Sequence, residues 1–188
     1  EGWGEYQYGF EESYGYRAGK FVRDKDAVIA AALLCEATLY YKLKEGLSII
    51  DVLDKIYRRF GYFIEDQVSI TLKGIKGKEQ MTQIMDMLRT AQISELGSIP
   101  IERTEDYELG IGRLPDGREY NLVLPKSNVL RFSFIGGGFA MARPSGTEPK
   151  IKFYFSVKSD KPELLEGKLN KVKEDLLSLV NRVLQSED

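Results

Sequence analysis

The spacing of apolar residues changes period near residue 62, and this change constrains the fold more than any other feature of the sequence. Over residues 26–46 and 48–61 the apolar side chains recur near the 3.6-residue period of an α-helix. Over residues 68–73 they alternate with polar side chains, as in a strand that is buried on one face. The sequence therefore predicts two helices in tandem followed by a sheet, with a domain boundary between residues 61 and 62.

The rest of the chain is predicted to contain further helices and short strands. An apolar stripe predicts a helix over residues 81–91, and Ser159 or Asp160 is expected to cap a last helix that has Pro162 near its first position. Five strands are expected, over residues 106–111, 119–124, 129–135, 138–143 and 150–157. Strands bracketed by helices predict an α/β (α+β) fold, in which a mostly antiparallel sheet carries its helices on one side.

Composition and charge exclude several kinds of function. Lys and Arg number 27 against 29 Asp and Glu, which is not the basic excess of a non-specific nucleic-acid binder. The absence of histidine excludes a Ser-His-Asp triad and a zinc site with His ligands within this chain. A lone Cys35 fits a reducing compartment, and no apolar run is long enough for a membrane span. We expect a cytoplasmic protein that binds neither nucleic acid nor membrane.

The first 21 residues are unusually rich in aromatic side chains. They contain seven of the 21 aromatics in the sequence, although chain termini are usually polar. The aromatic start suggests a piece of a longer protein.

The loop RPSGTEPK, residues 143–150, has the composition of a phosphate-binding site. An Arg fork, two hydroxyls and a glycine that lets the backbone approach closely supply the many donors that phosphate oxygens accept. Lys150 and Lys152 fall on one face of the following strand, so either could add positive charge. The alternative interpretation is an ordinary Arg followed by a Pro-Gly turn.

A second polar loop, GFEESYG at residues 9–15, is followed by RDKD at residues 23–26. Its carboxylates and hydroxyl are suited to neighbouring hydroxyls of a sugar, because a carboxylate accepts two hydrogen bonds while Ser can donate or accept. The alternative interpretation is a solvated turn.

Both loops resemble motifs of the α-D-phosphohexomutases, the phosphoglucomutase/phosphomannomutase family. RPSGTEPK resembles the phosphate-binding loop of the C-terminal domain, and FEESYG with RDKD resembles the sugar-selecting loop of domain three in the phosphoglucomutase branch. Phe10 departs from the family, in which many members have Gly. The resemblance implies that residues 1–61 form the C-terminal part of domain three. Residues 62–188 would then form domain four, with a fold like that of TATA-box-binding proteins.

The resemblance also implies a role for each matched residue. Glu11 and Ser13 would hold the sugar O3 and O4. The phosphate that is not being transferred would be held by Arg143, Ser145, Gly146 and Thr147, with Lys150 or Lys152 beside them. Lys25 matches a family lysine near the reacting hydroxyl and is a candidate acid-base or electrostatic group, although a surface lysine at a helix start is the equal alternative.

The implied reaction is a reversible shift of phosphate between O1 and O6 of a hexose. It would use a phosphoserine on domain one, a glucose 1,6-bisphosphate intermediate or activator, and Mg²⁺ on domain two. This chain contains no TASHN-like serine loop and no DGDGDR-like metal loop. We therefore expect a hexose phosphate and the parent's domains one and two as partners, no metal ligand here, and no activity from this chain alone. Alternatives are a stand-alone phosphosugar-binding or regulatory module, a nucleic-acid or interaction domain, and a mutase of mannose or pentose phosphates.

Overall fold

The structure is a computed structural model, which describes residues 5–11, 15–21, 23–72 and 74–185. The chain divides into two compact units, Glu1–Arg59 and Phe60–Asp188, and each is described by itself. Within the described ranges, no helix combines the length and the apolar character that crossing a bilayer requires.

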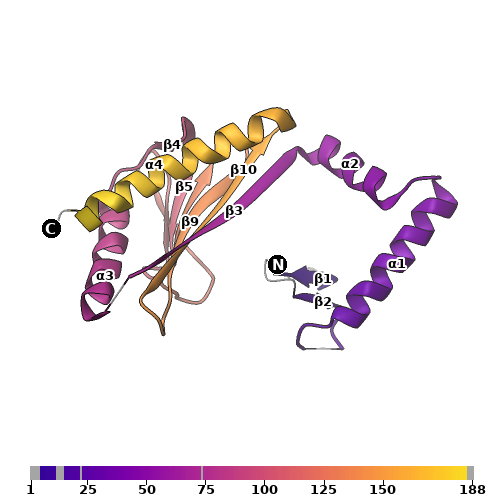
Figure 1. Cartoon of the computed structure of the whole chain (residues 1–188), viewed down its shortest axis with the longest axis horizontal. Helices are drawn as coiled ribbons and strands as arrows, with labels where there is room; N and C mark the ends of the chain where they lie inside the picture. The colour runs from indigo at the N-terminus through magenta and orange to yellow at the C-terminus, as the bar shows by residue number, and fades with distance from the viewer. Residues whose placement is uncertain (1–4, 12–14, 22, 73, 186–188) are drawn as a thin grey trace. The chain divides into compact units, whose positions relative to one another are not determined.

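The first unit consists of a small hairpin and two helices (Figure 1). Strands β1 (Tyr8–Phe10) and β2 (Tyr16–Ala18) pair antiparallel, and the sequence did not predict them. The two predicted helices are present as α1 (Ala27–Lys44) and α2 (Ile49–Phe60). Asp26 caps α1, because its carboxylate accepts the N–H groups of Val28 and Ile29 at 2.9 and 3.1 Å.

The start of α2 is a reciprocal capping box. The N–H of Ser48 donates to Asp51 Oδ2 at 2.8 Å, and the N–H of Asp51 donates to Ser48 Oγ at 3.2 Å. The Ser48 hydroxyl also donates to the carboxylate, and these bonds lower the pKa of Asp51. The cap thus fixes where the second helix begins.

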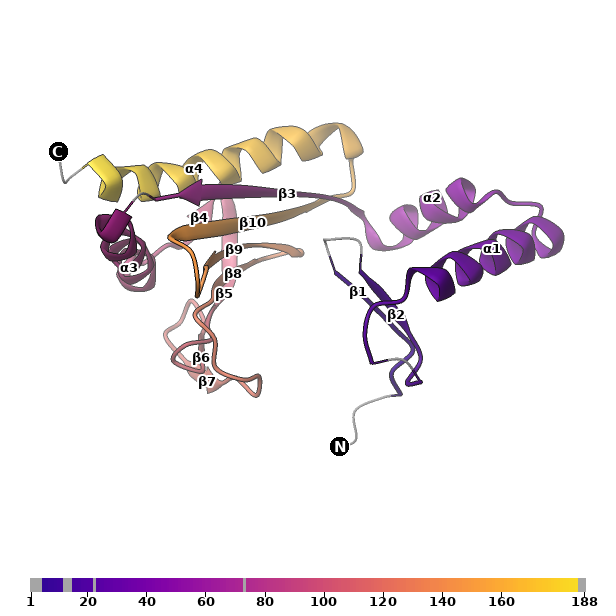
Figure 2. The ribbon, with the colours of Figure 1, turned by 60° about the horizontal axis from the view of Figure 1, so that its bottom comes forward.

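The second unit is an antiparallel sheet of eight strands (Figure 2). Its main path runs β3-β10-β9-β8-β5-β6-β7, and β4 pairs with β5. The strands are β3 (Tyr62–Thr71), β4 (Glu95–Leu96), β5 (Ile99–Asp106), β6 (Ile111–Arg113), β7 (Glu119–Asn121), β8 (Leu130–Phe134), β9 (Gly138–Pro144) and β10 (Lys150–Ser159). The alternation at residues 68–71 therefore belongs to the end of a long strand at one sheet edge.

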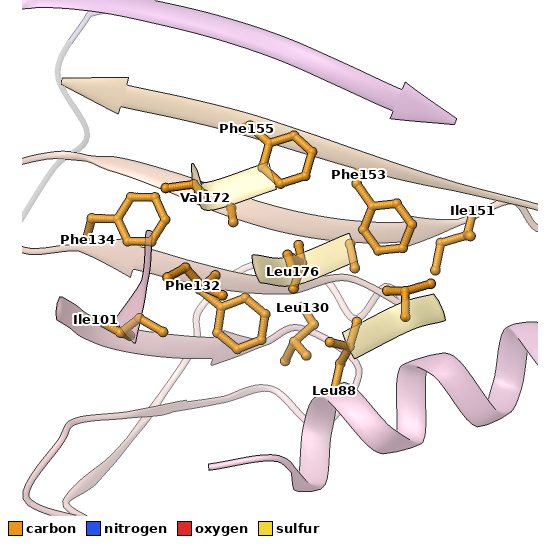
Figure 3. Close-up of a cluster of buried hydrophobic side chains, with 14 of the residues drawn as sticks. Leu88, Ile101, Leu130, Phe132, Phe134, Ile151, Phe153, Phe155, Val172 and Leu176 are labelled. Carbon is orange, nitrogen blue, oxygen red and sulfur yellow. The ribbon is translucent and has the colours of Figure 1, made fainter. Parts of the chain in front are cut away.

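Helices cover one face of this sheet. They are α3 (Gly74–Thr90) and α4 (Leu165–Gln185), and a 3₁₀ turn at Pro162–Leu164 precedes α4. Phe132, Phe153 and Phe155 extend from the strands toward the helices, where Val172 and Leu176 of α4 meet them (Figure 3). On β8, β9 and β10 the charged residues alternate with the buried apolar ones, so they lie on the opposite face. The α/β fold with an antiparallel sheet, predicted from sequence, is confirmed.

The expected strand over residues 106–111 is wrong, because β5 ends at Asp106 and a turn follows. Asp106 Oδ1 accepts the N–H groups of Glu108 and Leu109 at 3.0 and 3.2 Å, which stabilises that turn. The real strand was missed because its charged residues are buried: Glu105 and Asp106 are only 7% and 4% exposed. Their partners lie far away in sequence, so the pattern did not indicate a core strand.

The last helix also begins later than expected. The Ser159 hydroxyl accepts the N–H of Lys161 at 3.1 Å, before the 3₁₀ turn that contains Pro162. Lys161, the residue preceding that turn, makes no side-chain cap. Neither Ser159 nor Asp160 therefore caps α4 itself. The expected helix over residues 81–91 starts earlier, at Gly74.

Candidate functional site

The β9–β10 hairpin positions the basic residues of the predicted phosphate loop. Arg143 of β9 lies opposite Lys152 of β10, and Lys152 also lies opposite Ser69 of β3. Lys150 is on the same face of β10 as Lys152, since side chains alternate along a strand. The sheet therefore presents three cationic residues on the face opposite its helices.

No residue that the structure describes neutralises these three cations. Arg143, Lys150 and Lys152 form no ion pair or side-chain hydrogen bond with any residue that the structure describes. Arg143 is exposed, and the two lysines are half-buried. Like charges on adjacent strands are unfavourable without a counter-ion, so this arrangement favours the binding of an anion.

Ser145 organises the turn that connects the two strands. Its N–H donates to the Lys150 carbonyl at 2.7 Å, and its Oγ accepts the N–H groups of Thr147 and Glu148 at 3.4 and 3.2 Å. The Ser145 hydroxyl proton and the exposed Thr147 hydroxyl remain as donors for a ligand. The loop is thus shaped by its own hydrogen bonds, with Ser145 at the centre.

Gly146 is exposed and is not required by the packing of the chain. A Cβ atom added there would meet no heavy atom within 4 Å, and its φ is outside the left-handed region. Any need for glycine at this position would therefore come from a bound molecule.

The second predicted loop brings Glu11 and Lys25 together across the first hairpin. Lys25 Nζ lies 2.7 Å from Glu11 Oε1, and the Glu11 N–H donates to the Gly15 carbonyl at 2.9 Å. A Cβ atom on Gly15 would lie 2.2 Å from Lys25 Cδ and 2.7 Å from Glu11 Oε1. Gly15 therefore leaves room for the pair as it is arranged here, a role that sequence reasoning missed. Ser13 lies outside the described residues.

The Glu11 carboxylate stabilises the protonated form of Lys25. Its hydrogen bond, and then its charge, raise the pKa of Lys25 above the ordinary value of 10.5. Lys25 is therefore an ammonium ion at neutral pH. This favours a cationic or proton-donating role over that of a general base.

We find no metal site among the residues described here. No three His, Cys, Asp or Glu side chains in these ranges come together as a group that could hold an ion.

Comparisons with known proteins identify the family of the chain. A model of the phosphoglucomutase/phosphomannomutase family, for its alpha/beta/alpha domain III, matches residues 2–60. The phosphoglucomutase of Staphylococcus haemolyticus is 39% identical over 154 residues, which are 81% of this chain and 28% of the relative. That of Staphylococcus epidermidis is 37% identical over 164 residues, 87% of this chain and 30% of the relative. The chain belongs to the phosphoglucomutase/phosphomannomutase family.

The fold has a counterpart among solved structures. The open form of parafusin, a phosphoglucomutase from Paramecium, superposes with a TM-score of 0.63 at 15% sequence identity, covering 93% of this chain and 30% of that one. This chain thus spans less than a third of the length of the proteins it matches.

Proposed function

We propose that this chain is the substrate-binding portion of a phosphoglucomutase that interconverts glucose 1-phosphate and glucose 6-phosphate. The observation that carries the proposal is a row of three cations beside the Ser145–Thr147 turn, Arg143, Lys150 and Lys152, with which no described residue forms an ion pair. The names of the relatives support the reaction, since they are phosphoglucomutases.

The phosphate that is not transferred would bind at this row. Three cations exceed the two charges of a phosphate dianion, and an Arg fork can form two parallel hydrogen bonds to its oxygens. The Ser145 and Thr147 hydroxyls would add neutral donors, and Gly146 would let the backbone approach. Binding away from the reacting centre positions the substrate and thereby lowers the barrier.

The sugar would bind at Glu11, with Ser13 beside it. A carboxylate accepts several hydrogen bonds at once, so Glu11 can bind Lys25 and a sugar hydroxyl together. Protonated Lys25 would then stand next to the sugar as an electrostatic group or a proton donor.

The phosphoserine and the Mg²⁺ site of the proposed reaction are assigned to domains one and two, outside this chain. Mg²⁺ would neutralise charge on the transferring phosphoryl group, and none of the roles proposed for residues of this chain uses it. Glucose 1,6-bisphosphate would serve as intermediate and activator. The 188-residue chain alone should therefore show no turnover of glucose 1-phosphate when Mg²⁺ and the bisphosphate are supplied.

The test is Arg143→Ala in the full-length enzyme. Loss of a charge-assisted hydrogen-bond pair should lower kcat/KM for glucose 1-phosphate by about 10- to 150-fold. Arg118→Ala is the matched control, because Arg118 pairs only locally with Asp116 in an exposed turn. Equal kinetics for the two variants would refute the phosphate site.

Gly146→Ala separates binding from folding at the same loop. Because the added methyl meets no atom of the chain, the melting temperature should not fall, while kcat/KM should decrease if phosphate contacts the backbone there. An unchanged kcat/KM would show that no ligand approaches Gly146.

A further inference from the structure

A pocket lies in the sheet unit, on the sheet face opposite the helices. It has a volume of about 480 Å³, within the usual range for small-molecule sites. Arg131 of β8 and the residues Phe139 and Met141 of β9 form its floor. Tyr107, in the turn after β5, and the residues Leu124 and Pro125, after β7, contribute to its wall. Apart from Arg131, these side chains are largely apolar.

The wall is held in place by backbone hydrogen bonds. The Tyr107 N–H donates to the Val129 carbonyl at 3.0 Å, and the Ser127 N–H donates to the Tyr107 carbonyl at 3.2 Å. The segment between β7 and β8 is thereby tied to the turn that follows β5. The pocket is consequently formed before any ligand arrives.

Arg131 is oriented but incompletely hydrogen-bonded. Its guanidinium carbon lies 4.7 Å from the centre of the Phe139 ring, and its Nη1 lies 3.6 Å from Glu105 Oε2, beyond hydrogen-bond distance. Its buried Nε has no hydrogen-bond partner among the described residues. A buried donor without a partner is unfavourable. The Arg131 side chain as a whole is 31% exposed, so the accessible part of the guanidinium can still donate to a ligand.

The charges around Arg131 favour a monoanion over a dianion. Glu105, which is 7% exposed, lies between Arg131 and Arg103, whose Nε is 3.5 Å from Glu105 Oε1. The Tyr120 hydroxyl also faces Glu105, and burial followed by the Glu105 charge raises the pKa of Tyr120, which keeps it neutral. Arg103 also pairs with Glu102, whose Oε2 lies 2.8 Å from Arg103 Nη1, so the two arginines and the two carboxylates of this cluster balance. A pocket without excess positive charge disfavours a phosphate dianion more than a monocarboxylate.

We propose that this pocket binds a small monocarboxylate with an apolar body, its carboxylate on Arg131 and its body against Phe139, Met141 and Leu124. The site is separate from the proposed phosphate loop. Met141 and Arg143 share a face of β9, roughly 7 Å apart along the strand, and the two places differ in net charge.

Phenylacetate is a suitable probe, and phenylacetamide is its neutral counterpart. In an NMR titration of the 188-residue chain, phenylacetate should shift the amides of residues 107, 124–131 and 139–141. Phenylacetamide should bind at least ten times more weakly. This comparison uses the unaltered protein, so it does not depend on whether a variant folds.

Arg131→Met should weaken phenylacetate at least tenfold, whereas Arg118→Met, which removes an exposed guanidinium elsewhere in the unit, should leave it unchanged. The proposal is overturned by equal binding of acid and amide, by shifts confined to residues 143–150, or by no shifts at 20-fold molar excess and about 10 mM probe, a concentration well above the range of specific small-molecule sites.

Discussion

Helices α1 and α4 are the two longest helices in the described chain, and they use their apolar residues in opposite ways. In α4, Leu165, Leu169, Val172, Leu176 and Val180 form one buried stripe against the sheet. In α1 no residue is buried, and Val28 and Leu43 are 80% and 72% exposed. A helix that is apolar on all sides is typically buried in a larger core. The family domain that matches this region is an alpha/beta/alpha layer, in which such a helix would be covered.

The forces that hold the two regions differ accordingly. The sheet unit buries large aromatic and aliphatic side chains, which is the dominant favourable term in folding. The helical unit is held by caps, the short hairpin and exposed ion pairs such as Lys55–Glu45, which contribute little in water. Apolar side chains therefore form a core in one region and an uncovered surface in the other.

The largest test of this difference is a pair of truncations. Phe153→Ala removes a fully buried ring and should lower the free energy of unfolding by about 3–5 kcal/mol. Leu39→Ala in α1, where the side chain is 57% exposed, should change it by less than about 0.5 kcal/mol. Urea unfolding of the 188-residue chain, followed by NMR signals of each region, measures both. Equal losses would mean that α1 is packed as tightly as the sheet.

Ion pairs allow a second comparison, with a smaller effect. Arg89 Nε lies 3.0 Å from Asp106 Oδ2, and these side chains are 15% and 5% exposed. Asp106→Ala leaves the buried Arg89 guanidinium short of a partner and should lower the free energy of unfolding by about 3 kcal/mol. This is the lower end of the range for breaking a buried ion pair, because Arg89 keeps its contact with Glu108.

The matched pair in the helical unit is Arg58 with Asp54, 2.7 Å apart but 74% and 44% exposed. Asp54→Ala should therefore lower the free energy of unfolding by no more than about 0.5 kcal/mol. Thermal unfolding of the two variants gives the contrast, and similar values would show that burial does not set the strength of these pairs.

The fold could be predicted where each element carried its own period. Helices α1, α2 and α4 and strands β8 to β10 follow from local apolar spacing. Strand β5 does not, because Glu105 and Asp106 are buried by pairing with arginines on other elements. The hairpin of β1 and β2 has only three residues in each strand, too few to show a period.

The two candidate sites show the same limit. The phosphate loop was visible because its residues are contiguous, from Arg143 to Lys150. The contact between Glu11 and Lys25 was not visible in the sequence, because the two residues are 14 positions apart and only folding brings them together. Gly15, which makes room for that contact, gave no signal beyond being a glycine in a loop.

The smallest expected effect concerns Asp66 of β3, which bonds to Lys173 of α4 and so adds a polar contact to the packed face. The bond from Lys173, followed by that from the Gln67 N–H, lowers the pKa of Asp66 below its ordinary value of 3.8. The contact therefore stabilises the folded state fully above about pH 4, the ordinary pKa of an Asp side chain. This stabilisation is lost as the pH falls through the pKa of Asp66 in the folded state, because the unfolded state then binds more protons. The side chains are 41% and 23% exposed, so screening limits the effect to about 0.2–1 kcal/mol.

Asp66→Asn should flatten the acid limb of a plot of unfolding free energy against pH, and Lys173→Met should flatten it to a similar extent. If neither variant changes that limb, the contact does not contribute to holding α4 on the sheet, and the apolar stripe alone accounts for the difference from α1.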